Sequence, residues 1–169
     1  MAIHKIVFLP DPCLRALCIP VEEFNDELQQ LIDDMFETMY SARGVGLAAP
    51  QIGINLRLAV IDVTPDKSKQ FVLINPEILE SHGEEIYDEG CLSVPSAYDT
   101  VTRAARVKMK ALDRHGKEYV LEAEGLLCEA IQHEIDHLNG KLFVDLLSPV
   151  KRERARKKLE KYKREQARK

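Results

Sequence analysis

Two histidines and a glutamate in one short stretch carry the clearest chemical signal of this sequence. His133, Glu134 and His137 form the pattern H-E-x-x-H within residues 126–138, whose apolar residues are spaced as in a helix. Residues four apart project from one helical face, about 40° apart in direction. Both imidazoles can therefore bind one metal ion, and Glu134 can reach a water on that ion as a general base. The pattern favours a metallohydrolase, although an amphipathic helix with two surface histidines would have the same spacing.

A catalytic metal site of this kind needs a third protein ligand. In the extended motif H-E-x-x-H-x-x-G-x-x-H, the last histidine is the third ligand. Phe143 stands at that position here, which excludes a third histidine ligand of this kind. Glu153 could be a later glutamate ligand, but it stands in a segment rich in lysine and arginine. Cys128 would point to another side of the helix and pack in the core. Cys91 is left as the best donor, although a buried structural cysteine would fit the same sequence.

Two other features would surround such a site. Leu126, Glu129 and Ala130 lie within about 60° of the mean direction of the two histidines, so they are predicted to line a cavity beside the metal. Ala130 leaves room and Leu126 supplies an apolar wall, which suits an apolar substrate group of medium size. Residues 44–53 are rich in small residues that let a backbone approach a ligand. The amide of Gln51 could donate to a developing oxyanion there, although a simple turn would have the same composition.

The chain as a whole predicts one globular domain. Its 169 residues are 45% hydrophobic and 31% charged, which is enough to bury a core without disulfides. No apolar run approaches the roughly 18 residues of a membrane helix, and no cleavable signal is recognisable. We therefore expect a cytoplasmic protein with four reduced cysteines.

Charge is distributed unevenly along the chain. Residues 151–169 hold 11 Lys and Arg against 3 Asp and Glu, a net charge of +8, whereas residues 1–150 hold 13 against 25, a net charge of −12. A basic C-terminal segment on an acidic body indicates an anionic partner for that segment. Ala155, Leu159 and Tyr162 would form a narrow apolar stripe on a helix, so a plain solvated helix is an equally good interpretation.

The order of the expected elements predicts an α+β fold. Asn25 is expected to cap a helix that ends before Gly44, and Pro149 to begin a last helix. Strands are predicted over residues 56–63, 70–75, 106–112 and 117–122, the last two joined by a hairpin turn. We therefore expect a single compact domain of mostly antiparallel strands around a central H-E-x-x-H helix. Its catalytic part would cover residues 1–147, and a basic C-terminal helix over residues 148–169 would belong to the same domain.

Three of these segments together resemble the peptide deformylase family. G-x-G-x-A-A-x-Q appears at residues 44–51, E-G-C-L-S at residues 89–93 and Q-H-E-x-D-H at residues 132–137, in that order. The resemblance runs over nearly the whole chain. It implies an enzyme that removes the formyl group from the N-formylmethionine of new bacterial proteins.

The resemblance also implies a role for each matched residue. The metal would be Fe²⁺, which Zn²⁺, Ni²⁺ or Co²⁺ can replace, and its ligands would be Cys91, His133 and His137. Glu134 would take a proton from the attacking water and deliver one to the leaving amine. Gln51 and the backbone N–H of Leu92 would stabilise the oxyanion.

The implied substrate is the start of a nascent peptide. Its methionine side chain would lie against Val45, Leu126 and Ala130. Its backbone would pair with residues near Gly46 and Glu89 in the manner of an added strand. Glu89 is further expected to anchor the metal site by pairing with Arg103. Glu129 is expected at the mouth of the pocket, where relatives often carry aliphatic or basic residues, so the preference beyond methionine is not defined.

Partners and rival functions complete the expectations. In deformylases of this type a basic C-terminal helix docks on the ribosome near the exit tunnel, and neither a membrane nor a specific DNA partner is expected. One rival is a small H-E-x-x-H metallopeptidase that cleaves other peptide amides. Another is a structural metal in an RNA-binding module, which would need a fourth Cys or His, whereas the remaining histidines are isolated in the sequence.

Overall fold

Residues 3–168, the part of the chain that this computed structural model describes, contain three α-helices and seven β-strands. The helices are α1 (Asp26–Ser41), α2 (Gly125–Leu138) and α3 (Pro149–Ala167). The strands are β1 (Gly46–Ala48), β2 (Leu58–Ile61), β3 (Phe71–His82), β4 (Glu85–Cys91), β5 (Val94–Arg103), β6 (Arg106–Leu112) and β7 (Glu118–Glu124). Short 3-10 helices occupy Pro12–Leu14, Ala49–Ile52 and Phe143–Leu146. The expected α+β fold of one compact domain is confirmed.

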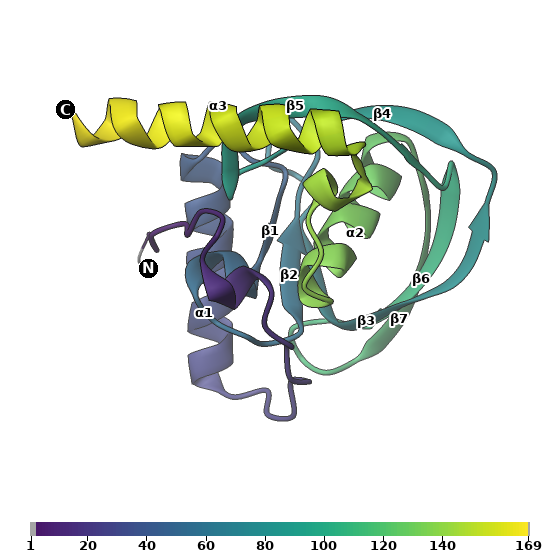
Figure 1. Cartoon of the computed structure of the whole chain (residues 1–169). Coiled ribbons are helices and arrows are strands. Elements are labelled where there is room, and N and C mark those ends of the chain that lie inside the picture. Colours follow the sequence, from purple (N-terminus) through teal and green to yellow (C-terminus); the bar gives the residue numbers. More distant parts are fainter. Residues whose placement is uncertain (1–2, 169) are drawn as a thin grey trace.

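Five strands form one antiparallel sheet in the order β1-β2-β3-β6-β7, and β4 pairs with β5 in a separate ribbon. Around β1 and β2 the sheet lies between α1 and α2 (Figure 1). The fully buried strand β2 explains this arrangement, because successive side chains of a strand point to opposite faces. Ala59 and Ile61 pack in the cluster that contains α2, and Leu58 and Val60 pack in the cluster that contains α1.

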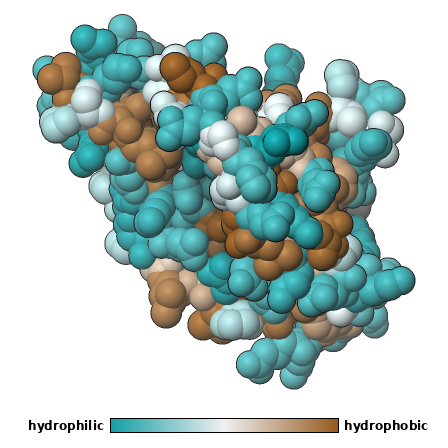
Figure 2. All heavy atoms as spheres, turned by 90° about the vertical axis from the view of Figure 1, so that its right-hand side faces the viewer, coloured by the Kyte–Doolittle hydropathy of each residue, from teal (hydrophilic) through white to brown (hydrophobic). Residues whose placement is uncertain are grey.

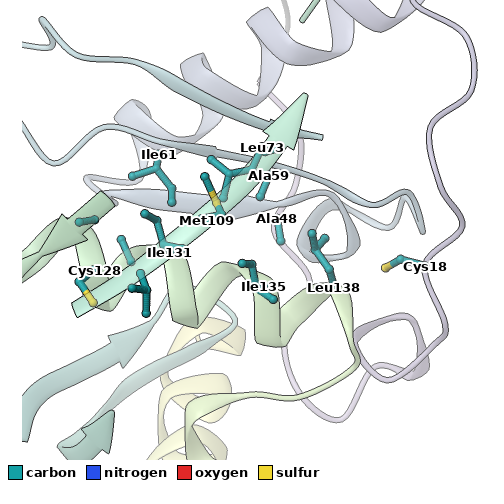
Figure 3. Packing of buried hydrophobic residues seen from close by; sticks show 14 residues of the cluster. Cys18, Ala48, Ala59, Ile61, Leu73, Met109, Cys128, Ile131, Ile135 and Leu138 are labelled. Atoms are coloured by element: carbon teal, nitrogen blue, oxygen red, sulfur yellow. The ribbon is translucent and has the colours of Figure 1, made fainter. Parts of the chain in front are cut away.

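One face of α2 is fixed by the hydrophobic core. Ile131 and Ile135 belong to the same buried cluster as Ile61, Leu73 and Met109 of the sheet (Figure 3). Burying an isoleucine or leucine side chain contributes about 1.5–3 kcal/mol, so this face holds the helix firmly. The opposite face of α2 is therefore directed toward the β4–β5 ribbon, where His133 contacts Glu89 of β4.

The helix starts follow the capping residues that the sequence predicts. The Asn25 side-chain oxygen accepts a hydrogen bond from the N–H of Leu28 at 2.9 Å, at the start of α1. At the start of α3, Ser148 Oγ accepts from the N–H of Lys151 at 3.4 Å, and Pro149 occupies the first helical position. Such caps satisfy backbone donors that have no partner within the helix.

The strands differ from the prediction in three places, of which the first is β1, a short strand in a segment where none was predicted. β3 continues beyond Asn75 to His82, because a shift of register between Ile74 and Glu77 accommodates Pro76, which has no N–H to donate. The ribbon of β4 and β5 was not expected, since the polar and glycine-containing sequence around Gly90 lacks a clear alternation. The predicted β6–β7 hairpin is confirmed.

Helix α3 packs on the domain through a narrow stripe. Ala155 and Leu159 are buried in a cluster with β5, and Tyr162 is half-buried, whereas most lysines and arginines of α3 are exposed. The apolar stripe predicted from the sequence is therefore confirmed. No helix within residues 3–168 has the length and apolar character needed to cross a bilayer.

Charged side chains cover the outer edge of the sheet. The edge strand β7 exposes Glu118, Glu122 and Glu124, and charges on an edge strand oppose pairing with another chain. On the face shown in Figure 2, hydrophilic residues cover most of the surface, and hydrophobic ones appear in patches between them. The cysteines are all free, as expected for reduced thiols.

Candidate metal centre

Helix α2 and the end of β4 bring three metal-binding side chains together. The Cys91 Sγ and His137 Nε2 atoms are 3.2 Å apart, and the Nε2 atoms of His137 and His133 are also 3.2 Å apart. All three potential ligand atoms lie within 4.8 Å of one another. Ligands at about 2.0–2.3 Å from a tetrahedral metal ion have separations of this order. Within residues 3–168 no fourth His, Cys, Asp or Glu joins the group, so a tetrahedral ion held by these three would keep one position for substrate or water.

The electrostatics of the two histidines suit a cation. Burial and the neighbouring His133 hold the pKa of His137 well below its ordinary value, so His137 is a neutral imidazole with a free lone pair. Burial also opposes charge on His133, but Glu134, Cys91 and Glu89 together raise its pKa well above the ordinary value. The acidic neighbours of His133 therefore favour a positive charge beside this histidine.

A buried carboxylate supports His133 from behind. Glu89 contacts Nδ1 of His133 and accepts two hydrogen bonds from the guanidinium of Arg103. Burial opposes the charged form of Glu89, but the hydrogen bonds from His133 and Arg103 outweigh it and lower its pKa to about 2. The expected Glu89–Arg103 pair is present, and Asp136 extends it by accepting from Arg103 Nη1 at 2.8 Å.

Glu134 has the environment of a general base. Its side chain is 3% exposed, and its Oε1 atom is buried without a hydrogen-bond partner. Burial raises the pKa of this carboxyl to about 7, close to the value at which proton transfer near neutral pH is most effective. Gly46 leaves space for it, because a Cβ atom on Gly46 would lie only 2.4 Å from Glu134 Oε2. A buried carboxyl oxygen without a hydrogen-bond partner is available to accept a hydrogen bond from a reacting water.

The amide of Gln51 is held in one orientation. Gln51 Oε1 accepts from the N–H of Ala48 at 2.9 Å, and Nε2 lies 3.2 Å from Ser93 Oγ and 3.7 Å from Cys91 Sγ. The NH₂ group therefore points toward the metal ligands. Leu92 follows Cys91 directly and lines the same cleft, so its backbone is also next to the metal site. Gln51 and Leu92 thus both lie beside Cys91 in the cleft.

These residues line a cleft of about 880 Å³. The sequence-predicted residues found in its wall are Val45, Gly46, Gln51, Glu89, Cys91, Leu92, Leu126, Glu129, Ala130, His133 and Glu134. His137 lies fully buried beneath it. The side chain of Glu89 is engaged by Arg103 and His133, so only its backbone is available to a substrate.

One expectation needs correction. Glu129 does not stand at the mouth of the pocket: it is only 7% exposed, and burial, the charge of Glu89 and a hydrogen bond with Glu89 raise its pKa to about 7. Glu153 pairs with Arg156 on the exposed face of α3, as expected for a residue of the Lys- and Arg-rich segment that does not bind the metal.

Parts of the cleft wall were not predicted. They include Tyr98 of β5, Tyr162 of α3 and the N-terminal residues Ile3, His4, Lys5, Ile6 and Phe8. No local pattern marks these residues, because they reach the cleft only through the packing of segments that are distant in the sequence.

An H-E-x-x-H helix that supplies two histidines and an acid, with a third ligand from a neighbouring strand, is the arrangement of a metal-dependent hydrolase. Residues 3–153 match the model of the family described as polypeptide deformylase. The chain belongs to the polypeptide deformylase family.

Individual relatives agree with this assignment over nearly the full chain. A peptide deformylase of Chromobacterium violaceum is 55% identical over 161 residues, which cover 95% of this chain and 96% of the relative. A peptide deformylase from Legionella pneumophila, known from a crystal structure, is 65% identical in sequence. The two structures match with a TM-score of 0.98 over 99% of both chains. A peptide deformylase from Ehrlichia chaffeensis in complex with actinonin is 38% identical, with a TM-score of 0.90 over 98% of both chains.

Proposed function

We propose that the protein removes the N-formyl group from the N-terminal formylmethionine of newly made proteins and releases formate. The observation that carries this proposal is the convergence of Cys91, His133 and His137 with the unpartnered carboxylate of Glu134 in one cleft. The family to which the chain belongs, and relatives named peptide deformylase, support the same reaction.

The chemistry divides between a metal ion and this chain's own residues. A metal held by Cys91, His133 and His137 would supply a Lewis acid and an acidified water. Glu134 is placed to accept the proton of the attacking water and to return one to the leaving amine. The amide of Gln51 and the backbone N–H of Leu92 are proposed to donate to the oxygen of the formyl carbon as negative charge develops on it.

The substrate is proposed to bind as an extended strand between two free strand edges. Within residues 3–168, β1 pairs only with β2, and β4 pairs only with β5. Gly46 of β1 and Gly90 of β4 both line the cleft, so a peptide between them could form ladder hydrogen bonds with both edges. The methionine side chain would then lie against Val45, Leu126 and Ala130, with Glu129 in the wall of the same pocket.

The metal is proposed to be Fe²⁺, with Zn²⁺, Ni²⁺ or Co²⁺ as substitutes. A Cys-His-His donor set with one open position accepts any of these ions, since intrinsic affinity does not select iron among them. Iron and zinc content of protein purified without oxygen, measured together with activity after exchange of the metal, tests this assignment.

The basic helix over residues 148–169 is proposed to be an accessory part of the catalytic domain, residues 1–147, that docks on the ribosome near the exit tunnel. Its lysines and arginines are largely exposed while Ala155 and Leu159 hold it to the domain. An enzyme that acts on nascent chains would be located in the cytoplasm. Ribosome binding should weaken steeply with salt. Equal binding by a 1–148 truncation would overturn this part of the proposal.

The reaction itself is tested by formate release from a formyl-Met tripeptide, with protein purified without oxygen. We expect rapid turnover by the wild-type chain and none with the unformylated peptide. Glu134→Ala should be inactive at equal metal content. Cleavage of internal peptide bonds without formate release would instead favour the metallopeptidase. Actinonin, which is bound in the Ehrlichia relative, is expected to inhibit the turnover.

A further inference from the structure

Tyr98 of β5 places an exposed aromatic ring at the wall of the proposed catalytic cleft. It lines the cleft together with Gly90 of β4, and it is 73% exposed. Single exposed apolar residues are common on protein surfaces, so the exposure alone indicates no function. The contact that Tyr98 makes with Gly90 is what distinguishes this ring.

The ring of Tyr98 occupies the position that a side chain of residue 90 would take. The two residues are paired directly across the β4–β5 ribbon. A Cβ atom on Gly90 would lie 2.4 Å from Cε1 and 2.5 Å from Cδ1 of Tyr98, so any side chain there would displace the ring. Because Gly90 has none, the ring lies over β4, one strand nearer to the free edge of the ribbon than its own backbone.

The alternation of side chains along β4 fixes the face on which the ring lies. Glu89 is buried and contacts His133, so its side chain points toward α2. Gly90, the next residue, faces the opposite way, and directly paired residues share one face of a ribbon. Tyr98 therefore lies on the outer face of the ribbon, which agrees with its exposure.

The same alternation applies to a peptide that is added to the edge of β4. Its formyl group must reach the metal beside Cys91, so its first residues are level with Gly90. The methionine side chain is proposed to point to the α2 side, against Leu126 and Ala130. The side chain of the next substrate residue then points to the outer face. Adjacent strands lie about 4.8 Å apart, so a ring above Gly90 is the direct neighbour of that second side chain.

We propose that Tyr98 is a specificity-determining residue, whose ring contacts the side chain after the formylmethionine and favours an apolar or aromatic residue at that position. This inference rests on the proposed function and narrows its substrates. Cross-strand contacts of aromatic rings are each worth a factor of up to about five in an equilibrium constant. Asp88, two residues before Gly90 on the same face, also lines the cleft, and its carboxylate disfavours an acidic second residue.

The first test compares the substrates formyl-Met-Phe-Ser and formyl-Met-Gly-Ser by their kcat/KM. The wild-type chain should prefer the phenylalanine peptide. Tyr98→Ala should reduce that preference about three- to fivefold, through a lower kcat/KM for the phenylalanine peptide alone. Tyr98→Phe keeps the ring and should keep the preference. Thr102→Ala, an exposed position on the same face of β5 that does not line the cleft, should keep it as well.

A ring that only supports the backbone at Gly90 gives a different result. Loss of such a support would move the neighbouring Cys91 and lower the turnover of both peptides by the same factor. The ratio of the two kcat/KM values in Tyr98→Ala would then equal the wild-type ratio. That outcome would overturn the inference, whatever the absolute rates.

The second test measures binding without turnover. Zn²⁺-loaded Glu134→Gln protein is titrated with each peptide by calorimetry, with and without Tyr98→Ala. The phenylalanine peptide should bind about three- to fivefold more weakly without the ring, and the glycine peptide equally well. If the wild-type chain released formate from neither peptide, the proposed function would fail, and this comparison would still decide the role of Tyr98. Equal changes for both peptides, or none, would contradict that role.

Discussion

Glu89 and Arg103 form a buried, two-pronged ion pair directly behind the metal ligands. Arg103 Nε donates to Glu89 Oε2 at 2.9 Å, and Arg103 Nη2 donates to Glu89 Oε1 at 2.6 Å. Glu89 contacts Nδ1 of His133, and the third arm of the guanidinium binds Asp136 at 2.8 Å. One arginine on β5 therefore orients the carboxylate that orients His133, a proposed metal ligand on α2. Such partners fix the tautomer and the ring position of a ligating histidine.

Arg103→Ala should weaken both the fold and the metal site. It leaves the buried carboxylate of Glu89 without its cation, which costs about 3–5 kcal/mol in the free energy of unfolding. Loss of the support for His133 should lower metal affinity roughly 10–100-fold, measured by competition with a chelator. Arg103→Lys keeps the positive charge but loses the planar guanidinium that binds both oxygens of Glu89. Its losses of stability and of metal affinity should therefore be intermediate. Unchanged metal affinity in Arg103→Ala would contradict the anchoring role.

Gly46→Ala should abolish most activity while the domain stays folded. The new Cβ would lie 2.4 Å from Oε2 and 2.9 Å from Cδ of Glu134, so the buried carboxylate must move. Displacing the general base should lower kcat roughly 10²–10⁴-fold. The measurement is formate release at equal metal content, with circular dichroism to verify the fold.

Gly44→Ala is a matched control for this substitution. Its Cβ would meet Cδ1 of Leu92 at 2.7 Å, the far end of a flexible and only partly buried side chain. Leu92 can rotate away, so the loss of kcat should be well below that of Gly46→Ala. Equal losses in the two variants would show that crowding in this loop, and not displacement of Glu134, limits activity.

The metal helix was predictable from the sequence because its chemistry is local. The spacing of His133 and His137 fixes their direction once the helix forms, and Ile131 lies on the core side of that helix. Cys91 was found by elimination, since nothing near it in the sequence requires it to meet α2. The β4–β5 ribbon and the contact of Phe8 with Tyr162 depend on tertiary packing, which no local period encodes.

The pH dependence of activity should have an acid limb that belongs to Glu134. A general base works only in its charged form, and burial raises the pKa of this carboxyl to about 7. A bound metal cation lowers that pKa, so kcat/KM should rise with pH through a midpoint no higher than about 7. Glu134→Gln should lose the limb together with roughly 10²–10⁴ in rate. A limb that persists in the residual activity of Glu134→Gln must come from another group.

Glu129→Gln should stabilise the protein at alkaline pH. The ordinary pKa of this carboxyl is 4.5, whereas in the folded protein burial and the neighbouring Glu89 raise it to about 7. Folding therefore disfavours the charged form: the penalty is absent below pH 4.5, grows up to about pH 7 and is constant above it. Glutamine removes the charge, so the free energy of unfolding should rise by about 1–3 kcal/mol at pH 8.

The pH dependence of stability distinguishes the removal of a buried charge from a stabilisation that does not depend on pH. Because the penalty is mostly absent near pH 5, the advantage of Glu129→Gln should shrink strongly there, as denaturant unfolding at both pH values with equal metal loading would measure. Glu122→Gln removes an exposed carboxylate from β7 and should show no such difference. If Glu129→Gln gained as much stability at pH 5 as at pH 8, the gain could not come from removing the buried charge of Glu129 and its repulsion from Glu89.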